Sequence, residues 1–210
     1  MAEPRTDESL MLAYRAGEAA AFHELVRRHR GPVFNFLVRQ VGDRARAEDL
    51  LQEAWLKVVR SAASYETRAK FTTWLYTIAR NLCVDASRRD RYRAADSLDQ
   101  VGTVGGDERA LSERVAARGA SPERGAHGGQ LRQAIEAALA RLPEEQREVF
   151  LLREYSGVAF KDIAEVTGTP ENTVKSRMRY ALEGLRRHLL ELGVDGDLAD
   201  EPAVRSAGTP

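Results

Sequence analysis

A cluster of side chains that can bind a polyanion lies between Thr169 and Leu189. Five cations stand there against two acids, Glu171 and Glu183, although the formal net charge of the 210-residue chain is zero. The guanidinium and ammonium groups donate hydrogen bonds to phosphate oxygens, and such a local cluster on a neutral chain indicates a polyanion-binding face. The cations are Lys175, Arg177, Arg179, Arg186 and Arg187.

The spacing around these cations is typical of a helix-turn-helix. Ala164 is small enough for two helices to approach, Gly168 permits the positive φ of the turn, and Val174 is expected to pack beneath it. On the second helix an apolar stripe recurs at helical spacing and is expected to be buried. It consists of Val174, Met178, Ala181, Leu182 and Leu185.

The outer face of this second helix begins at its N-terminal end, which a recognition helix presents to base edges in the major groove. We therefore expect this face to bind duplex DNA. The alternative is that this face is simply the solvated side of an amphipathic helix. For Tyr180 alone, the alternative is a ring that packs on a neighbouring side chain. The face consists of Thr173, Lys175, Ser176, Arg177, Arg179 and Tyr180.

A second set of cations is interleaved with aromatic residues around the segment FTTWLYTIARN. Bases stack on rings while phosphates meet cations, a combination suited to single-stranded nucleic acid. We expect an inner stripe of Leu75, Ile78, Ala79, Leu82 and Ala86, with Thr73 and Tyr76 on the outer face; Trp74 and Phe71, taken singly, are also typical of a core. The candidate strand-binding residues are Tyr65, Arg68, Lys70, Phe71, Thr77, Arg80, Asn81 and Arg88.

The segment RARAEDLLQEAWLKVVR predicts a third amphipathic helix. Its expected buried residues are Ala47, Leu51, Ala54, Trp55 and Val58, and its outward residues are Glu48, Asp49, Gln52, Glu53 and Leu56. Asp49 and Glu53 can in principle chelate a metal, but no Glu-x-x-His motif on another helix completes a site. A solvated face and a protein-binding face remain, and Gln52 and Leu56, which interrupt the charges, favour the second.

The periodicity predicts an all-α chain of two small helical domains joined by a flexible linker. Residues 1–95 form the first domain, 96–130 a linker with seven glycines, 131–192 the helix-turn-helix domain and 193–210 a disordered acidic tail. Gly42 and Asp43 are expected to end and begin helices, and Pro32 to bend one. The expected helices are Glu8–Ala16, Ala19–Val41, Arg44–Arg60, Thr72–Arg91, Leu131–Arg141, Pro143–Tyr155, Ala159–Thr167 and Pro170–Leu192.

The composition argues against several classes of protein. The sequence has neither a run of eighteen apolar residues nor the hydrophobic segment of a signal peptide, so we expect a cytoplasmic location without membrane insertion. Cys83 is the single cysteine and the four histidines share no ligand spacing, so we expect neither a metal nor a cofactor. A helical hydrolase using Glu48, Asp49 and Glu53 lacks a nucleophile or base at supporting spacing.

Three motifs in the same order resemble the extracytoplasmic-function group of bacterial RNA polymerase sigma factors. They are AEDLLQEAWLKVV, FTTWLYTIARNLCVDASRR and LARLPEEQREVFLLREYSGVAFKDIAEVTGTPENTVKSRMRYALEGLRRHL, and the resemblance covers about residues 8–190. It implies a promoter-specificity subunit without catalysis, whose partners are core polymerase, through its clamp and flap, promoter DNA and an anti-sigma factor. Asn172 stands where the family usually has glycine.

The same resemblance implies roles for the candidate residues. Asp49, Gln52, Glu53 and Leu56 would bind polymerase, and the Tyr65–Phe71 loop with Asn81 would read the melted −10 element. Lys175, Ser176, Arg179 and Tyr180 would read the duplex −35 element. The alternative is a stand-alone helix-turn-helix regulator, which would bind duplex DNA tightly without polymerase and would need a self-complementary dimer interface.

Overall fold

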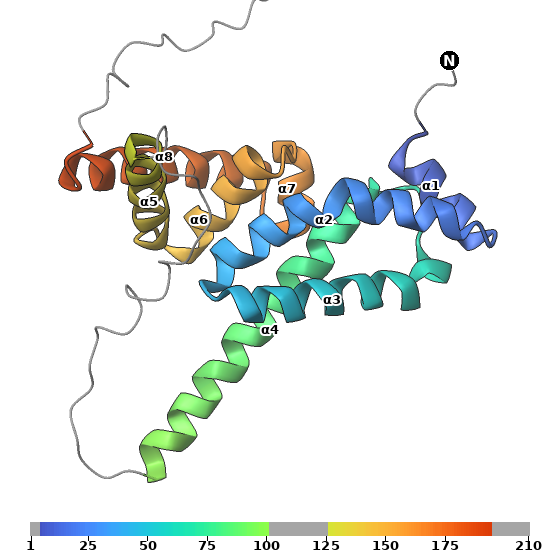
Figure 1. Cartoon of the computed structure of the whole chain (residues 1–210), viewed down its shortest axis with the longest axis horizontal. Helices are drawn as coiled ribbons and strands as arrows, with labels where there is room; N and C mark the ends of the chain where they lie inside the picture. Colours follow the sequence, from blue (N-terminus) through green and yellow to red (C-terminus); the bar gives the residue numbers. More distant parts are fainter. Residues whose placement is uncertain (1–4, 101–125, 195–210) are drawn as a thin grey trace, which may run out of the picture.

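The computed structural model describes residues 5–100 and 126–194, and within these ranges it contains helices and turns but no strand. The predicted all-α class is therefore confirmed. The elements before residue 100 and those after residue 126 form two groups that lie against each other (Figure 1). Most of the predicted linker and the acidic tail from residue 195 onward lie outside the described residues.

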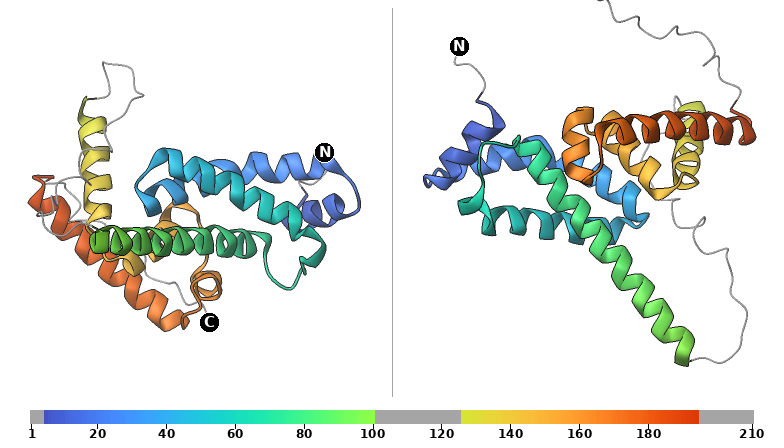
Figure 2. Two further views of the ribbon diagram at one scale, coloured as in Figure 1. Left: turned by 90° about the horizontal axis from the view of Figure 1, so that it is seen from below. Right: turned by 180° about the vertical axis from the view of Figure 1, so that it is seen from behind.

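Between residues 5 and 100 the first domain has four α-helices, and α2 packs against both α1 and α3, while α4 runs across α2 and α3 (Figure 2). The buried core includes Met11, Leu25, Phe36, Val58 and Leu75. The elements are α1 (Asp7–Arg15), α2 (Ala19–Val41), α3 (Arg44–Arg60), a single 3₁₀ turn η1 (Ala62–Ser64) and α4 (Phe71–Gln100).

Local sequence explains how α2 ends and α3 begins. Gly42 adopts a left-handed φ of 73° at the end of α2, and the Asp43 carboxylate accepts a hydrogen bond from the Arg46 backbone N–H at 2.9 Å. Both predicted caps are thus confirmed. α2 continues through Pro32, where Gly31 has no Cβ to clash with the proline ring. The bend expected there stays a prediction.

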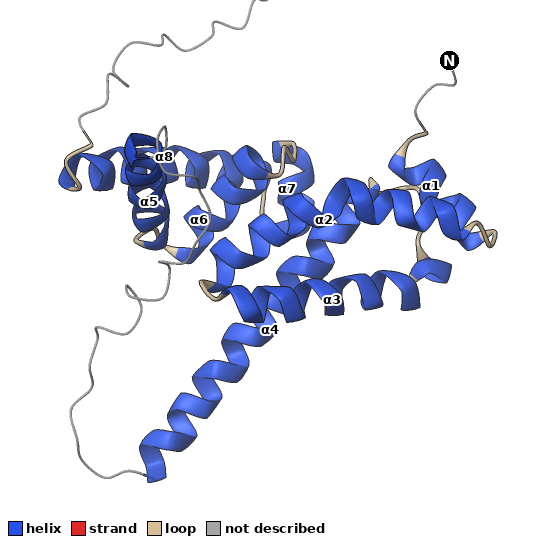
Figure 3. Ribbon diagram, in the orientation of Figure 1, coloured by secondary structure: helices blue, strands red, loops and turns tan. Residues whose placement is uncertain are grey.

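The second domain packs three helices against α8: α5, α6 and α7 (Figure 3). Pro143 and Pro170 directly precede their helices instead of occupying the first turn, and their carbonyls accept from Arg147 and Val174. The elements are α5 (Ala126–Ala140), α6 (Glu144–Phe150), a π-helical turn η2 (Leu151–Tyr155), α7 (Phe160–Thr167) and α8 (Glu171–Glu191).

Two helices extend into the segment that was predicted to be linker. α4 continues from Arg91 to Gln100, because no glycine or proline interrupts it before Gly102. α5 begins at Ala126 instead of Leu131 and includes Gly128 and Gly129, which local helix propensity does not explain. Apolar periodicity predicts the part of a helix that packs against a neighbour. It does not predict helical turns that extend beyond that contact.

The helix-turn-helix has the predicted geometry. Gly168 has a φ of 65° and donates its N–H to the Ala164 carbonyl, and Val174 is fully buried. The prediction for Leu182 was wrong, because its side chain is 49% exposed. Gly184 and Leu185 are buried where α8 packs within the domain, whereas Leu182 is not covered.

None of the helices in residues 5–100 and 126–194 is both long and apolar enough to cross a lipid bilayer.

Replacement of Gly168 by Ala should lower the free energy of unfolding by about 1 kcal/mol, because a Cβ is strained at positive φ. A Cβ at this position would meet no atom within 4 Å, so backbone strain is the expected cause of the loss of stability. Gly168→Asn is the matched control, since asparagine tolerates this conformation and should lose less. Urea unfolding of both variants measures the difference, and equal stability of Gly168→Ala and the wild type would contradict the role of the turn.

Candidate nucleic-acid and protein-binding sites

The face of α8 predicted to bind duplex DNA is exposed around Lys175, Arg179 and Tyr180. The Lys175 ammonium lies 2.7 Å from Glu171, and the Arg179 guanidinium lies 3.8 Å from Glu183 and over the Tyr180 ring. These pairs are exposed and span one helical turn, so each contributes little stability and can exchange for a phosphate. The Ser176 hydroxyl is also exposed and donates to the Asn172 carbonyl.

Two residues of the predicted face lie differently. Arg177 was expected to point outward, but its side chain is only 19% exposed and its guanidinium lies 2.6 Å from Glu145 of α6. Arg177 follows Val174 by three residues, which turns it toward the neighbouring helix. Thr173 is half-buried in the first turn of α8. Arg177 therefore joins α8 to α6 in this structure instead of extending the exposed face.

The outward face of α3 carries the predicted protein-binding residues. Asp49 and Gln52 are exposed, Glu53 is half-buried with its carboxylate 3.9 Å from Lys57, and Leu56 is 53% exposed. Val59, which sequence periodicity did not select, adds another apolar side chain that is 40% exposed. An apolar patch among charges favours a protein partner over plain solvation.

Gln52 also lines an open groove of about 490 Å³ between α2 and α3. Phe34 and Trp55 form apolar parts of its wall, and the Arg44 guanidinium lies over the Phe34 ring, 5.2 Å from its centre. The prediction missed the contribution of α2, because periodicity within one helix cannot show which neighbour completes a groove. The candidate protein-binding face therefore extends from α3 onto α2.

The Tyr65–Phe71 loop differs from the prediction in one respect. The Tyr65 ring was expected to be available for base stacking, but Tyr65 is 2% exposed, and Phe71, a strand-binding candidate that taken singly is typical of a core, is fully buried. The Tyr65 ring packs on Trp74, and burial raises the pKa of its hydroxyl to about 12. Both rings are core residues because burial of a large aromatic surface stabilises the fold. Arg68 and Lys70 remain exposed at the surface of the loop.

On α4, the predicted outer face is partly buried. Asn81 and Arg88 are exposed as expected, and the half-buried Thr77 donates its hydroxyl hydrogen to the Thr73 carbonyl. Thr73 and Tyr76 were wrongly placed outside, because 3% and 1% of their surfaces are exposed. The Tyr76 ring packs edge-on against Phe36 of α2, so two faces of α4 are covered instead of one.

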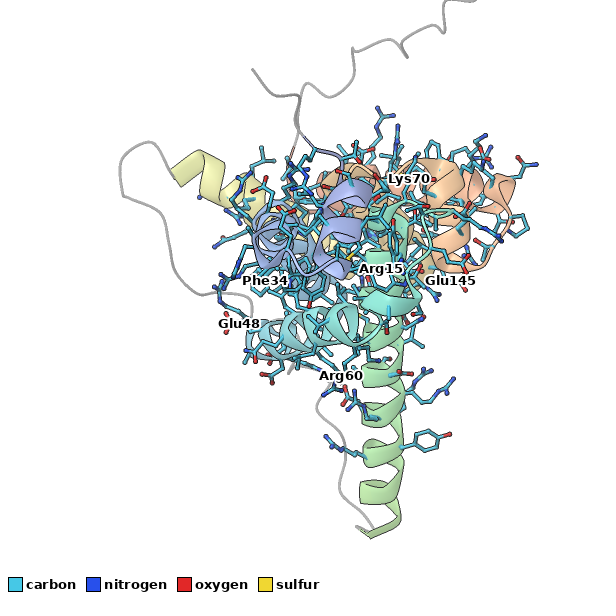
Figure 4. All side chains as sticks on the ribbon, turned by 90° about the vertical axis from the view of Figure 1, so that its right-hand side faces the viewer. Arg15, Phe34, Glu48, Arg60, Lys70 and Glu145 are labelled. Carbon is cyan, nitrogen blue, oxygen red and sulfur yellow. The ribbon has the colours of Figure 1, made fainter. Side chains whose placement is uncertain are left out.

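Within residues 5–100 and 126–194, three ion pairs join the two domains, and each has its cation on the first domain and its carboxylate on the second. Lys70 directly precedes α4 and lies beside the second domain (Figure 4). The pairs are Arg39–Glu136 at 2.6 Å, Lys70–Asp162 at 2.7 Å and Arg80–Glu148 at 2.7 Å. Lys70 and Arg80, two of the candidate strand-binding residues, are thus occupied by carboxylates.

The Arg80–Glu148 pair has the most buried carboxylate of the three, because only 7% of the Glu148 side chain is exposed. Burial raises the pKa of Glu148, and the Arg80 charge only partly opposes this effect. Desolvation therefore outweighs the attraction of Arg80, as is common for buried ion pairs. Since the raised pKa means that the ionised carboxylate is disfavoured, the pair is a weak source of net stability above the ordinary pKa of glutamate.

Comparison with family models gives two matches within the chain. The model described as Sigma-70 region 2 matches residues 25–93, and the model described as Sigma-70, region 4 matches residues 132–185. The first range contains α3 and the larger part of α4, and the second contains α7 and the larger part of α8. The candidate residues on α3, α4 and α8 therefore all lie within the matched ranges.

Curated relatives and a solved structure agree with the models. ECF RNA polymerase sigma factor SigL of Mycobacterium tuberculosis is 35% identical over 181 residues, which cover 85% of this chain and 94% of that protein. ECF RNA polymerase sigma factor SigW of Bacillus subtilis is 29% identical over 178 residues, with the same coverage. The sigma factor RpoE of Bartonella quintana, solved with the anti-sigma factor NepR, has a TM-score of 0.63 at 26% identity and covers 83% of this chain and 98% of its own.

Proposed function

The chain belongs to the extracytoplasmic-function sigma factors of bacterial RNA polymerase, and we propose how its two domains divide that work. A sigma factor of this family directs core polymerase to specific promoters and initiates transcription by −10 and −35 recognition and promoter melting. Residues 1–95 bind the polymerase clamp and the −10 element, and residues 131–192 bind the −35 element and the polymerase flap. The protein has no catalysis of its own.

The observation that carries this division is the location of the exposed polar side chains. On α8 the exposed cations begin in the first turns, where a recognition helix meets the major groove. Lys175 and Arg179 bind phosphates and base edges there, and Tyr180 and Ser176 add neutral hydrogen-bonding groups. Arg177 supports α8 from the side through Glu145.

Asn81 is the centre of the proposed −10 site. Its exposed amide offers a donor and an acceptor to an unpaired base edge. Arg88 and Arg68 are exposed nearby in sequence and hold phosphates. Because Tyr65 and Phe71 are buried, base selection rests on hydrogen bonds and cations, while the two rings support the loop from beneath.

The first domain binds polymerase through the α3 face. Gln52 and Leu56 combine polar and apolar surface, and the groove beside Phe34 and Trp55 accepts side chains of the clamp. A stand-alone regulator fits less well, because the Sigma-70 region 2 model matches the first domain. We assign the exposed face of α3 to polymerase binding and not to a dimer interface. An anti-sigma factor is the further protein partner that we propose, by analogy with the RpoE complex.

In the described arrangement the second domain covers part of the proposed −10 site. Lys70 and Arg80 contact Asp162 and Glu148, so these cations reach DNA only after the carboxylates leave. We infer that the two domains separate when the protein assembles with polymerase and promoter DNA. The weak net stability of the Arg80–Glu148 pair is consistent with such a separation.

Asn81→Ala should reduce open-complex formation and relax base preference at one −10 position, while polymerase binding is unchanged. Loss of one good base contact corresponds to about 1–3 kcal/mol of discrimination. Run-off transcription with core polymerase first identifies a promoter, and permanganate reactivity of its thymines then compares wild-type and variant holoenzymes. Equal reactivity across a panel of −10 variants would remove Asn81 from the mechanism, and the absence of any transcript would contradict the proposed function.

Lys175→Ala and Arg179→Ala should each make the negative slope of log affinity against log salt less steep by about 0.9, for binding of holoenzyme to duplex −35 DNA. Arg177→Ala is the matched control, because its guanidinium faces Glu145 and should leave the slope unchanged. Fluorescence anisotropy at several salt concentrations measures all three slopes. If the salt slope changed only for Arg177→Ala, then Arg177 and not Lys175 or Arg179 would be the residue that contacts phosphate.

Neutralisation of the three carboxylates at the domain interface should separate the domains. We expect the triple variant Glu136→Gln, Asp162→Asn and Glu148→Gln to have a larger radius of gyration in small-angle X-ray scattering. A control with the same change of charge replaces Glu18, Glu24 and Glu191 by Gln, because these residues pair within their own domains. An unchanged radius in the interface variant would show that ion pairs do not hold the domains together.

A further inference from the structure

The N-terminus of α4 lacks a capping residue of its own. The first N–H groups of a helix have no partner inside the helix and are usually bound by a side-chain oxygen just before it. The residues before Phe71 are Ala69 and Lys70, and neither side chain can accept a hydrogen bond. A side-chain acceptor for the Phe71 N–H therefore has to come from another part of the chain, since water is the alternative partner.

Glu8 of α1 supplies that partner. Its Oε1 atom accepts a hydrogen bond from the Phe71 backbone N–H at 3.0 Å, although the two residues are 63 positions apart in sequence. The carboxylate charge also lies at the positive end of the helix dipole, where it is favourable. The same helix holds the other end of the loop, because Arg15 donates from Nη1 to the Tyr65 carbonyl at 2.8 Å.

The loop between these two contacts is held from within as well. The Tyr65 hydroxyl donates to the Ala69 carbonyl at 3.1 Å, and its ring is buried against Trp74. Arg68 and Lys70 are the cations that this arrangement leaves exposed. The backbone of the whole Tyr65–Phe71 loop is thus attached to α1 at both ends.

α1 is fixed to the core and to α2, so it can hold the loop in a defined position. Leu10 and Met11 are buried in the core. Asp7, at the start of α1, contacts two residues of α2: its carboxylate lies 2.9 Å from the Arg28 guanidinium and 2.7 Å from His29 Nε2. A displacement of the loop relative to α2 would therefore have to break contacts that α1 makes on both sides.

We propose that Glu8 and Arg15 are positioning residues for recognition of the unpaired −10 strand. They act through the backbone of the Tyr65–Phe71 loop and through the first turn of α4, the helix that carries Asn81. Glu8 and Arg15 both precede residue 25, where the region 2 match begins, so that match does not select them. The inference rests on the proposed function of the loop and of Asn81.

The test uses Glu8→Ala, which removes the acceptor, and Glu8→Gln, which keeps an amide oxygen in nearly the same place. Asp43→Ala is the matched control, because Asp43 caps α3 in the same domain through the Arg46 N–H and lies outside the loop. Holoenzymes made with each full-length variant form open complexes on promoters that carry each of the four bases at the position read by Asn81. Binding to core polymerase is measured in parallel.

We expect Glu8→Ala to lower the preference for the best base about fivefold, the factor that corresponds to a typical helix cap, with core binding unchanged. Glu8→Gln should restore most of that preference. Asp43→Ala should destabilise the protein by a similar amount yet keep the wild-type base preference. In the free full-length protein, the Phe71 amide should exchange its hydrogen faster in Glu8→Ala than in Glu8→Gln.

Unchanged base preference in Glu8→Ala, or an equal loss in Asp43→Ala, would overturn the positioning role and leave Glu8 as a purely structural cap. An unchanged exchange rate of the Phe71 amide would overturn the contact itself. A wild-type holoenzyme without any base preference in the −10 segment would overturn the proposed function, and this inference with it. The wild-type panel therefore separates the two failures.

Discussion

The position of α4 is the constraint on which most of this structure depends. One face of the helix buries Leu75, Ala79 and Leu82 in the first domain, where removal of apolar surface from water supplies the main driving force. Its N-terminus is capped from α1, and its side bears Arg80 against the second domain. Because a helix is rigid over this length, these contacts together determine where Asn81 and Arg88 lie.

The charges of the chain cancel in sum but not in space. Cations of the first domain meet carboxylates of the second in all three interdomain pairs among the described residues. Carboxylates and phosphates present similar anionic oxygens to Lys and Arg, so the second domain offers the first domain the same kind of partner as a DNA strand. In the proposed mechanism DNA has to replace this covalently linked partner, and the burial that raises the pKa of Glu148 disfavours its ionised form in the interface.

Contacts within one helix or one turn were predictable from sequence, and contacts between helices were not. Asp43, Gly42 and Gly168 act on neighbours within a few residues, so their roles follow from residue type. Tyr76 could not be placed, because α2 covers a second face of α4 that periodicity leaves polar. The role of Glu8 could not be predicted either. The absence of an acceptor just before Phe71 indicates that a side-chain cap has to come from another part of the chain, but it does not identify which residue.

The proposed DNA-binding faces differ in how available they are. On α8, Lys175 and Arg179 have 52% and 65% of their side chains exposed, and among the described residues their ion pairs are with Glu171 and Glu183 of the same helix. On the first domain, Arg80 has 26% exposed and is paired across the interface. Exposed i,i+4 pairs exchange readily with solvent, whereas an interdomain pair is released only when both domains move. Under the proposed assignment, the duplex-binding face is exposed in the described arrangement, whereas the strand-binding face would become complete only after separation of the domains, which would couple strand recognition to assembly.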